Sequence, residues 1–356
     1  MTASLHSRLP TLIRSALRPL LDPYRRYRHA KLIHAARVAL AVLASIGLST
    51  ALRMPHSEWS TITVLIVVGG LQHHGNIRKK AAERALGTSI GAAAGLLMIL
   101  LHSAVHAPLV IYAAMAVACG VCAYYAIGKA GYIALLSAIT MVIVAGHGDN
   151  EIVDGLWRAV NVLIGIAIAL AFSFALLLYA TYSWRYKLAD ALRACAVVQA
   201  RIAGSRDISD EAHLKEMAAL SALLVQLRSL MPSVSKECGI SMQQLEAIQR
   251  GLRLCISYLE ILASVRPARD DAAGREFVRH AMRGENRRLR DRIVAASRAL
   301  KFGTPSRLGP GSKRRQEAPP DAPPQLSGYV SISAKLAAET DQLRERLLDT
   351  ARAWNI

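Results

Sequence analysis

Six apolar segments separated by short connections fill the chain between Leu32 and Tyr182. An apolar run of about 20 residues crosses a bilayer as a helix, because lipid offers backbone polar groups no partner outside the helix itself. We therefore expect an all-α protein in which residues 31–182 form a six-helix transmembrane bundle. The segments are 32–52, 59–71, 84–101, 107–128, 131–146 and 153–182.

The distribution of lysine and arginine predicts the orientation of these spans. The net charge is +19 although 53% of the residues are hydrophobic. The cations gather in a basic N-terminal arm (1–30), before the third segment (Arg78, Lys79 and Lys80), after the fourth (Lys129) and beyond the sixth. The other three connections are poor in cations. Because loops rich in lysine and arginine stay on the cytoplasmic side, we expect both termini in the cytoplasm.

Beyond residue 182 the composition becomes charged, and the apolar residues follow a helical period. We expect a cytosolic amphipathic-helical domain at 183–302, whose first helix continues the sixth span and whose last, at 272–301, is rich in arginine. Residues 303–328 are predicted to be a Pro-rich disordered linker, and 329–356 a C-terminal amphipathic helix. Membrane lipid, a protein partner and plain solvent are alternatives for the arginine-rich face. Because aromatic residues make up only 5% of the chain, we expect no nucleic-acid partner.

Three arginines lie inside predicted spans: Arg37 in the first, Arg84 in the third and Arg158 in the sixth. An ionisable residue within a span costs at least about 2.5 kcal/mol, so it usually faces the bundle and marks a pathway. By the predicted topology, Arg37 and Arg84 are near the cytoplasmic side and Arg158 near the other. This arrangement suits an anion that enters at one end and leaves at the other. The alternative for Arg84 is a structural cation that snorkels to the interface.

Small residues recur at helical spacing beside two of these arginines. They allow close approach of helices, which lipid does not otherwise drive together. The predicted helix-packing positions are Gly87, Thr88, Gly91, Gly95 and Gly165. Asn161 follows Arg158 on the same face of the sixth segment, so we place it on the substrate path.

The second segment, 59–71, is only thirteen residues long. A helix of that length spans about 20 Å, less than the hydrocarbon core of about 30 Å. It ends in Gly69-Gly70, and short, Gly-interrupted segments mark binding sites in transporters. Trp59, Thr61 and Thr63 offer a planar acid an aromatic face and two hydroxyls. An ordinary tilted helix with Trp59 as an interfacial anchor is the alternative.

The stretch WSTITVLIVVGGLQHHGNIRKKAAERALGTSIGAAAGL resembles the fusaric acid resistance family of bacterial inner-membrane proteins. The resemblance lies in a tryptophan that opens a Thr/Val/Ile run, a basic stretch and the motif R-x-x-G-T-x-x-G. The matching residues are Trp59, Thr61, Thr63, Arg84, Gly87, Thr88 and Gly91. It implies a bacterial inner-membrane exporter of aromatic carboxylic acids. Many members have two six-span halves and this chain has one, so the resemblance implies a homodimer. A periplasmic accessory protein is left open as a further partner.

Catalytic and cofactor motifs are missing from the sequence. There is no phosphate loop, dinucleotide fingerprint or His-Glu-x-x-His motif, so we expect neither an enzyme nor a cofactor. His102 and His106 have helical i, i+4 spacing, but two ligands rarely hold a metal, so no metal site is predicted. A weaker alternative is an enzyme acting on lipid-linked substrates at the loop from His147 to Glu151.

Taken together, these patterns predict a transporter that exports small organic anions, driven by the membrane potential or an ion gradient. Its substrate path would contain Arg84, Arg37 and Arg158 together with Trp59, Thr61, Thr63 and Asn161. The alternative from another class is a non-transporting membrane scaffold whose basic cytosolic domain binds lipid or protein partners.

Overall fold

The computed structural model describes residues 23–68, 74–105, 107–128, 130–146, 151–175, 179–204, 210–268, 270–308 and 323–354, with the backbone alone at 74–81, 175, 210 and 354. All regular elements in these ranges are helices, which confirms the predicted all-α class. The predicted arm up to residue 22, Gly69-Gly70, Lys129 and His147 lie outside the described residues.

The chain divides into two compact units. The apolar unit comprises residues 28–178, and the C-terminal unit comprises residues 179–356 together with 1–27.

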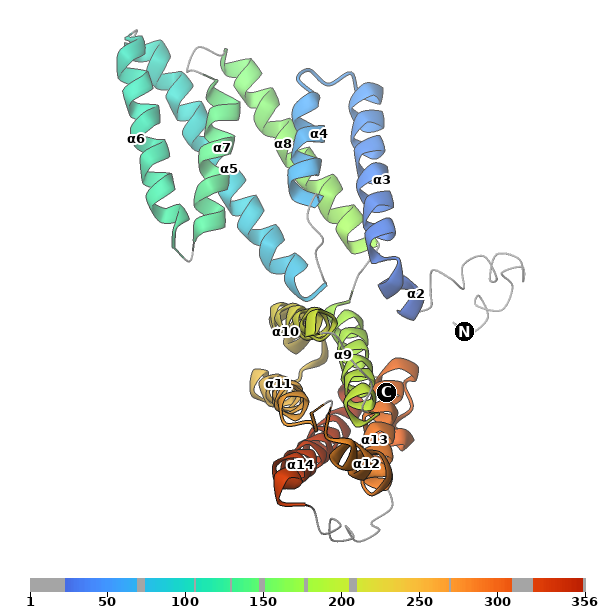
Figure 1. Ribbon diagram of the computed structural model, residues 1–356. Helices are drawn as coiled ribbons and strands as arrows, with labels where there is room; N and C mark the ends of the chain where they lie inside the picture. The colour runs from blue at the N-terminus through green and yellow to red at the C-terminus, as the bar shows by residue number, and fades with distance from the viewer. Residues whose placement is uncertain are drawn as a thin grey trace, which may run out of the picture. The chain divides into compact units, whose positions relative to one another are not determined.

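The helices of the apolar unit match the six predicted segments in order, and successive helices run antiparallel (Figure 1). They are α3 (Ala30–Ala51), α4 (Glu58–Val68), α5 (His74–Val105), α6 (Pro108–Ala126), α7 (Gly131–Ala145) and α8 (Ile152–Ala175). We call the end where α3, α5 and α7 begin the first end, and the end where α4, α6 and α8 begin the second end.

Four of these helices are long and apolar enough to cross a bilayer, namely α3, α5 from Ala82, α6 and α8. The other two are apolar but shorter, with 11 residues in α4 and 15 in α7. Large apolar side chains point outward from the unit, and those of Leu109 at the start of α6 and Ile127 just after its end are 82% and 91% exposed. A surface of this kind is stable against lipid. The chain is therefore a multi-pass membrane protein.

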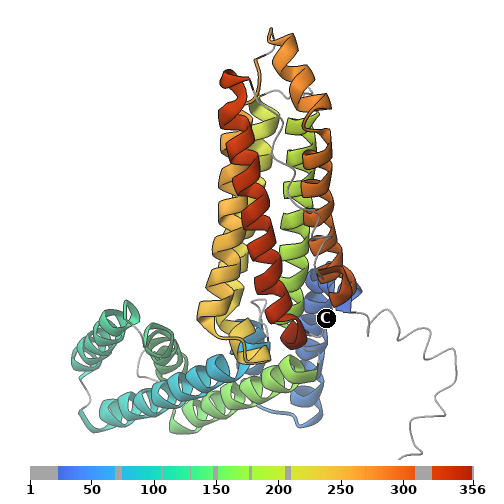
Figure 2. The same cartoon turned by 90° about the horizontal axis from the view of Figure 1, so that it is seen from below.

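The C-terminal unit is a bundle of long helices that run side by side (Figure 2). Its helices are α9 (Ala180–Ala203), α10 (Asp210–Cys238), α11 (Met242–Ser264), α12 (Ala272–His280), α13 (Arg283–Phe302) and α14 (Ser327–Asp349), with 3-10 turns at Pro305–Leu308, Pro324–Leu326 and Ala351–Trp354. One core joins them, because apolar residues recur every three or four positions on each helix. Trp184 on α9 is its largest side chain and is fully buried.

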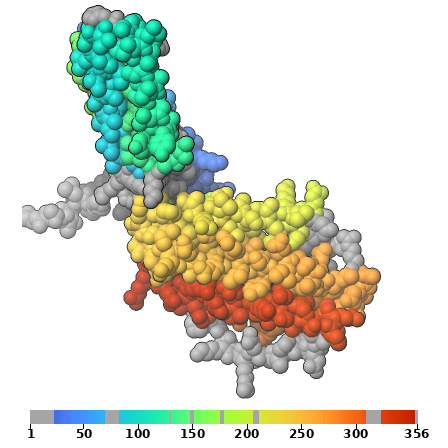
Figure 3. All heavy atoms as spheres, turned by 90° about the vertical axis from the view of Figure 1, so that its left-hand side faces the viewer, coloured from blue at the N-terminus to red at the C-terminus, as the bar shows by residue number. Residues whose placement is uncertain are grey.

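Helices α10, α11 and α14 form successive bands on one face of this unit (Figure 3). By length and hydropathy alone, α10 also meets the criterion for a membrane span. However, Leu220, Leu227 and Met231 on one of its faces are buried in the helical core. Short helix α2 (Pro23–Arg28) joins the same unit, since the rings of Tyr24 and Tyr27 both lie 5.2 Å from that of Tyr186 on α9.

The predicted continuation of the sixth span into the next helix is wrong. Helix α8 ends at Ala175, α9 begins at Ala180, and Tyr179 between them has an extended backbone. The physical reason is a cap supplied from α10. The carboxylate of Glu237 accepts hydrogen bonds from the backbone N–H groups of Ala180 (3.0 Å) and Thr181 (2.9 Å). These are donors that a helix start leaves free.

The predicted single arginine-rich helix at 272–301 is also wrong, because α12 ends at His280 and α13 begins at Arg283. The backbone N–H groups of Ala281 and Met282 both donate to the carbonyl of Phe277, which closes the turn. Met282 is 2% exposed, so the break turns an apolar side chain into the core. Of the predicted linker, residues 309–322 lie outside the described residues, and Leu308 and Leu326 beside them are buried.

Candidate functional site

Helix α5 packs on α7 through the glycine stripe of the sequence motif. A Cβ atom added to Gly87 would lie 2.8 Å from the carbonyl oxygen of Ile133, and one added to Gly95 would lie 2.8 Å from Cβ of Val144. At Gly91 an added Cβ would overlap the carbonyl of Ser137. Only glycine therefore permits this helix spacing, because backbone atoms cannot yield as a flexible side chain can.

Hydroxyl groups add hydrogen bonds across the same interface. Ser137 on α7 donates to the carbonyl oxygen of Gly87 at 3.0 Å. Thr88, the neighbour of Gly87 in the motif, is 4% exposed. In the membrane, small residues and interhelical hydrogen bonds of this type hold helices together. The α5–α7 pair is thus a fixed platform beside Arg84.

Arg84 lies one turn before this stripe and is 7% exposed. Its Nη2 donates to the backbone carbonyl of Ile66 on α4 at 2.7 Å, and its Nε donates to the hydroxyl of Tyr132 on α7. The guanidinium carbon also lies 5.2 Å from the centre of the Tyr132 ring, within cation–π range. Arg84 therefore joins three helices at the first end of the apolar unit.

The third nitrogen of this guanidinium, Nη1, is buried and has no hydrogen-bond partner among the described residues. No carboxylate of those residues forms an ion pair with Arg84 either. An unbalanced buried charge is unfavourable by several kcal/mol. The arrangement therefore leaves one directed N–H donor group and one positive charge for an anion.

Arg37 lies in the first half of α3, also toward the first end. It is 1% exposed, and its Nη2 donates to Nδ1 of His34 at 2.8 Å. One whole face of α3 turns inward, because Ala41, Ser45 and Ser49 are buried with Arg37.

The two threonines predicted to meet a substrate already have protein partners. Thr61 shares a hydrogen bond of 3.1 Å with Ser45 on α3, and Thr63 donates to the carbonyl of Trp59 at 2.7 Å. Trp59 is half-buried against the neighbouring apolar side chains. Gly165 on α8 brings that helix close to α4, since an added Cβ would lie 2.8 Å from Cβ of Thr63. The Thr61 hydroxyl therefore joins α4 to α3, and Thr63 lies where α8 packs closely on α4.

Arg158 and Asn161 lie near the start of α8, toward the second end. Nη1 of Arg158 donates to the carbonyl of Ile143 on α7 at 3.2 Å. Asn161 is fully buried, and its Nδ2 donates to the carbonyls of Pro55 (2.8 Å) and Trp157 (2.9 Å). Asn161 thus holds the α3–α4 connection against α8.

The structure brings Arg84 together with Tyr132, which the sequence analysis did not single out. The predicted arginines do not meet: Arg37 and Arg158 bond to separate groups, and Arg158 lies toward the opposite end. Tyr132 is the second residue of α7, directly before the run that packs on the glycine stripe. Tyr132 could have been found from the sequence by pairing the start of α7 with the glycine stripe of α5, because this pairing places Tyr132 beside Arg84.

The comparisons with known proteins decide the family. A family model described as the fusaric acid resistance protein family matches residues 31–355. The chain belongs to this family. In this family member the motif R-x-x-G-T-x-x-G combines a buried cation, Arg84, with the glycines that bring α5 onto α7.

Three relatives extend this result. The chain is 31% identical over 247 residues to the inner membrane protein YeeA of Escherichia coli K12, and the match covers 68% of each chain. It is 30% identical over 124 residues to the p-hydroxybenzoic acid efflux pump subunit AaeB of Escherichia coli O9:H4. That second match covers 30% of this chain and only 19% of AaeB. AaeB of Yersinia enterocolitica is similar to the same extent, at 31% identity over 127 residues.

Proposed function

We propose that the chain is a transporter that exports small organic anions, with aromatic carboxylates as the substrate class. The observation that carries the proposal is the buried Nη1 of Arg84, which has no partner among the described residues. A carboxylate placed there accepts a charge-assisted hydrogen bond and balances the charge of the guanidinium. A neutral solute can accept the hydrogen bond but cannot balance the charge.

Tyr132 gives the aromatic part of the substrate a neighbour. Its hydroxyl accepts from Arg84, and its ring lies beside the guanidinium. An aromatic acid bound to Arg84 therefore meets an aromatic edge or face at the same place. Trp59 is the second aromatic group that we assign to the path, on α4. Arg37 and Arg158 extend the path toward the first and the second end.

The names of the relatives support the substrate class. AaeB is a subunit of an efflux pump for p-hydroxybenzoic acid, and the similarity with it covers part of the chain. We assign this protein to the bacterial inner membrane, where YeeA is also placed by its name. The first end, with its basic segments, is assigned to the cytoplasm together with both termini. A homodimer supplies the second six-helix half, and an accessory protein in the periplasm is a further candidate partner.

The membrane potential is a sufficient driving force for such export. With the inside negative, a monovalent anion is pushed outward by about 2.3 kcal/mol per 100 mV, which corresponds to a concentration ratio of about fifty. The proposed transport therefore involves neither ATP hydrolysis nor a catalytic residue.

Purified protein in liposomes tests this proposal. Vesicles loaded with p-hydroxybenzoate are given a defined potential with potassium and valinomycin, and the efflux is compared with that of p-hydroxybenzamide. We expect efflux of the acid that rises as the interior becomes more negative, and little efflux of the neutral amide. Equal release of both compounds, or release equal to that of loaded liposomes without protein, would leave the scaffold alternative as the better account.

A further inference from the structure

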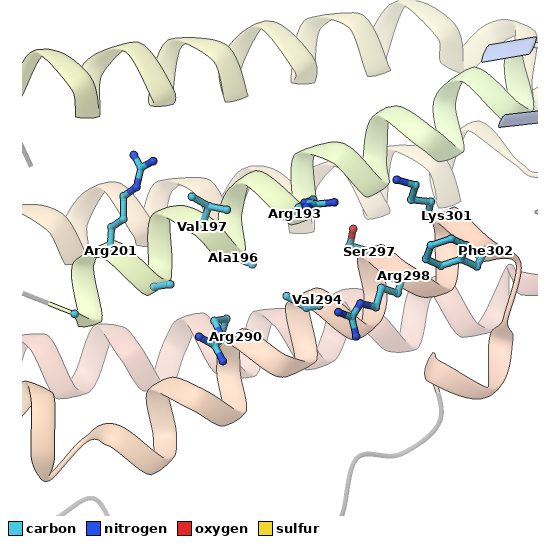
Figure 4. A pocket seen from close by; sticks show the side chains of 12 residues that line it. Arg193, Ala196, Val197, Arg201, Arg290, Val294, Ser297, Arg298, Lys301 and Phe302 are labelled. Carbon is cyan, nitrogen blue, oxygen red and sulfur yellow. The ribbon is translucent and has the colours of Figure 1, made fainter. Parts of the chain in front are cut away.

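A cationic groove lies in the C-terminal unit between α9 and α13 (Figure 4). Its volume is about 800 Å³, within the range of about 300–1,000 Å³ that is typical of small-molecule sites. Five of its twelve lining residues are cations, and no carboxylate lines it. The cations are Arg193, Arg201, Arg290, Arg298 and Lys301.

Hydrogen bonds between its two walls fix the groove. Ser297 on α13 donates to the carbonyl oxygen of Ala189 on α9 at 2.7 Å. At the other end of the groove, Gln199 on α9 donates to the carbonyl of Asn286 at 3.2 Å. Both side chains are buried. The two rows of cations are therefore held at a constant separation by the packed backbone beneath them.

Two of the five cations are balanced by neighbouring carboxylates. Arg201 pairs with Glu216 on α10, and Nη2 of Arg290 lies 3.5 Å from a carboxylate oxygen of Asp291. Arg193 and Arg298 are exposed, and in the part of the chain that the structure describes neither has an ion-pair or hydrogen-bond partner.

Lys301 is the third cation without a carboxylate partner in that part of the chain. Its Nζ lies 4.6 Å from the centre of the Tyr24 ring and 5.8 Å from that of Phe302. These contacts hold the ammonium group in place but do not neutralise it. Figure 4 shows Arg193 on α9 and Arg298 and Lys301 on α13 at the same end of the groove.

We propose that this groove binds an anion whose phosphate groups carry two or more negative charges, taken from a free phosphate compound or from a lipid head group. Three cations without carboxylate partners are not balanced by a single carboxylate. Arginine forks match the paired oxygens of phosphate groups, and lysine adds a point charge. The site is distinct from the transport path, because all of its residues belong to the C-terminal unit.

Titration of the full-length protein in detergent with inorganic pyrophosphate tests this site. We expect saturable binding that weakens about tenfold in each of the single variants Arg193→Gln and Arg298→Gln, and further in the double variant. The matched control is Arg250→Gln with Arg253→Gln, which removes two exposed arginines of α11 outside the groove. Thermal unfolding of every variant shows that the folded state is kept.

A second titration separates the two sources of phosphate. Short-chain phosphatidic acid is compared with phosphatidylcholine of the same chain length in the same detergent. Binding of pyrophosphate that depends on Arg193 and Arg298 assigns the site to a free phosphate compound, and binding of phosphatidic acid alone assigns it to a lipid. The proposal is overturned if neither ligand binds, if the α11 control weakens binding equally, or if benzoate binds as tightly as pyrophosphate.

Discussion

Arg84 on α5 and Ile66 on α4 are joined by a hydrogen bond of 2.7 Å from the guanidinium Nη2 to the backbone carbonyl oxygen. Ile66 is two residues from the end of α4, so the bond satisfies a carbonyl that the ending helix leaves without an intrahelical partner. Arg84 is thus fixed by the backbone and by Tyr132, while its Nη1 has no hydrogen-bond partner among the described residues. The first prediction tests whether the Tyr132 hydroxyl orients this guanidinium.

The substitution Tyr132→Phe removes the hydroxyl that accepts from Arg84 and keeps the ring beside the guanidinium. We expect KM for an aromatic acid to rise about threefold to tenfold, because one of the two bonds that orient Arg84 is lost. The bond to Ile66 remains, so maximal flux should change little. Liposome efflux at several substrate concentrations measures both quantities. An unchanged KM would show that Tyr132 does not position Arg84.

The substitution Gly91→Ala introduces a Cβ atom against the carbonyl of Ser137 and Cβ of Thr140. We expect a loss of about 1–3 kcal/mol of stability, since α5 and α7 must separate along their glycine contact. The matched control is Gly120→Ala on α6, where an added Cβ has no atom within 4 Å. Thermal unfolding in detergent compares the two. Similar midpoints for both variants would contradict the close packing.

The substitution Glu237→Ala removes the carboxylate that caps the start of α9. It accepts from the backbone of Ala180 and from both the N–H and the hydroxyl of Thr181. We expect a loss of about 1–2 kcal/mol, the usual effect of deleting a helix cap. Glu246→Ala on the exposed face of α11 is the control and should unfold as the wild type does. A wild-type midpoint for Glu237→Ala would show that the cap contributes nothing.

Two cysteines of the C-terminal unit should resist labelling. Burial raises the pKa of the Cys255 thiol to about 12, and burial also raises the pKa of Cys195. A raised pKa keeps the thiol neutral at neutral pH, and the thiolate is the reactive form. We expect maleimide to modify neither residue in the folded protein and both after unfolding in detergent, as read by mass spectrometry of peptides. Rapid labelling of Cys255 in the folded state would contradict the packing of α11 against α14.

The helices and the glycine contact were predictable because their signals are local. Apolar runs gave the six helices of the apolar unit, and the spacing of Gly87, Gly91 and Gly95 marked one face of α5. That inward face also carried Arg84. Such patterns depend only on neighbours three or four residues apart along one helix.

Features that depend on distant partners were not predictable in the same way. The break before α9 is stabilised by Glu237, which follows Ala180 by 57 residues. Thr61 looked available for substrate, but its hydroxyl meets Ser45 on a neighbouring helix. Tyr132 lies beside Arg84 only because of the register in which α7 packs on α5. Each of these depends on which helix packs where, and the sequence pattern of one helix does not contain that information.

The most direct measurement is potential-driven efflux of p-hydroxybenzoate from liposomes that contain the Arg84→Gln variant, compared with Arg53→Gln. Both changes remove one arginine from the apolar unit, but Arg53 is exposed in the α3–α4 connection. The account predicts that efflux with Arg84→Gln equals that of loaded liposomes without protein. It predicts near wild-type efflux for Arg53→Gln, with both proteins folded. Wild-type efflux through folded Arg84→Gln would contradict it.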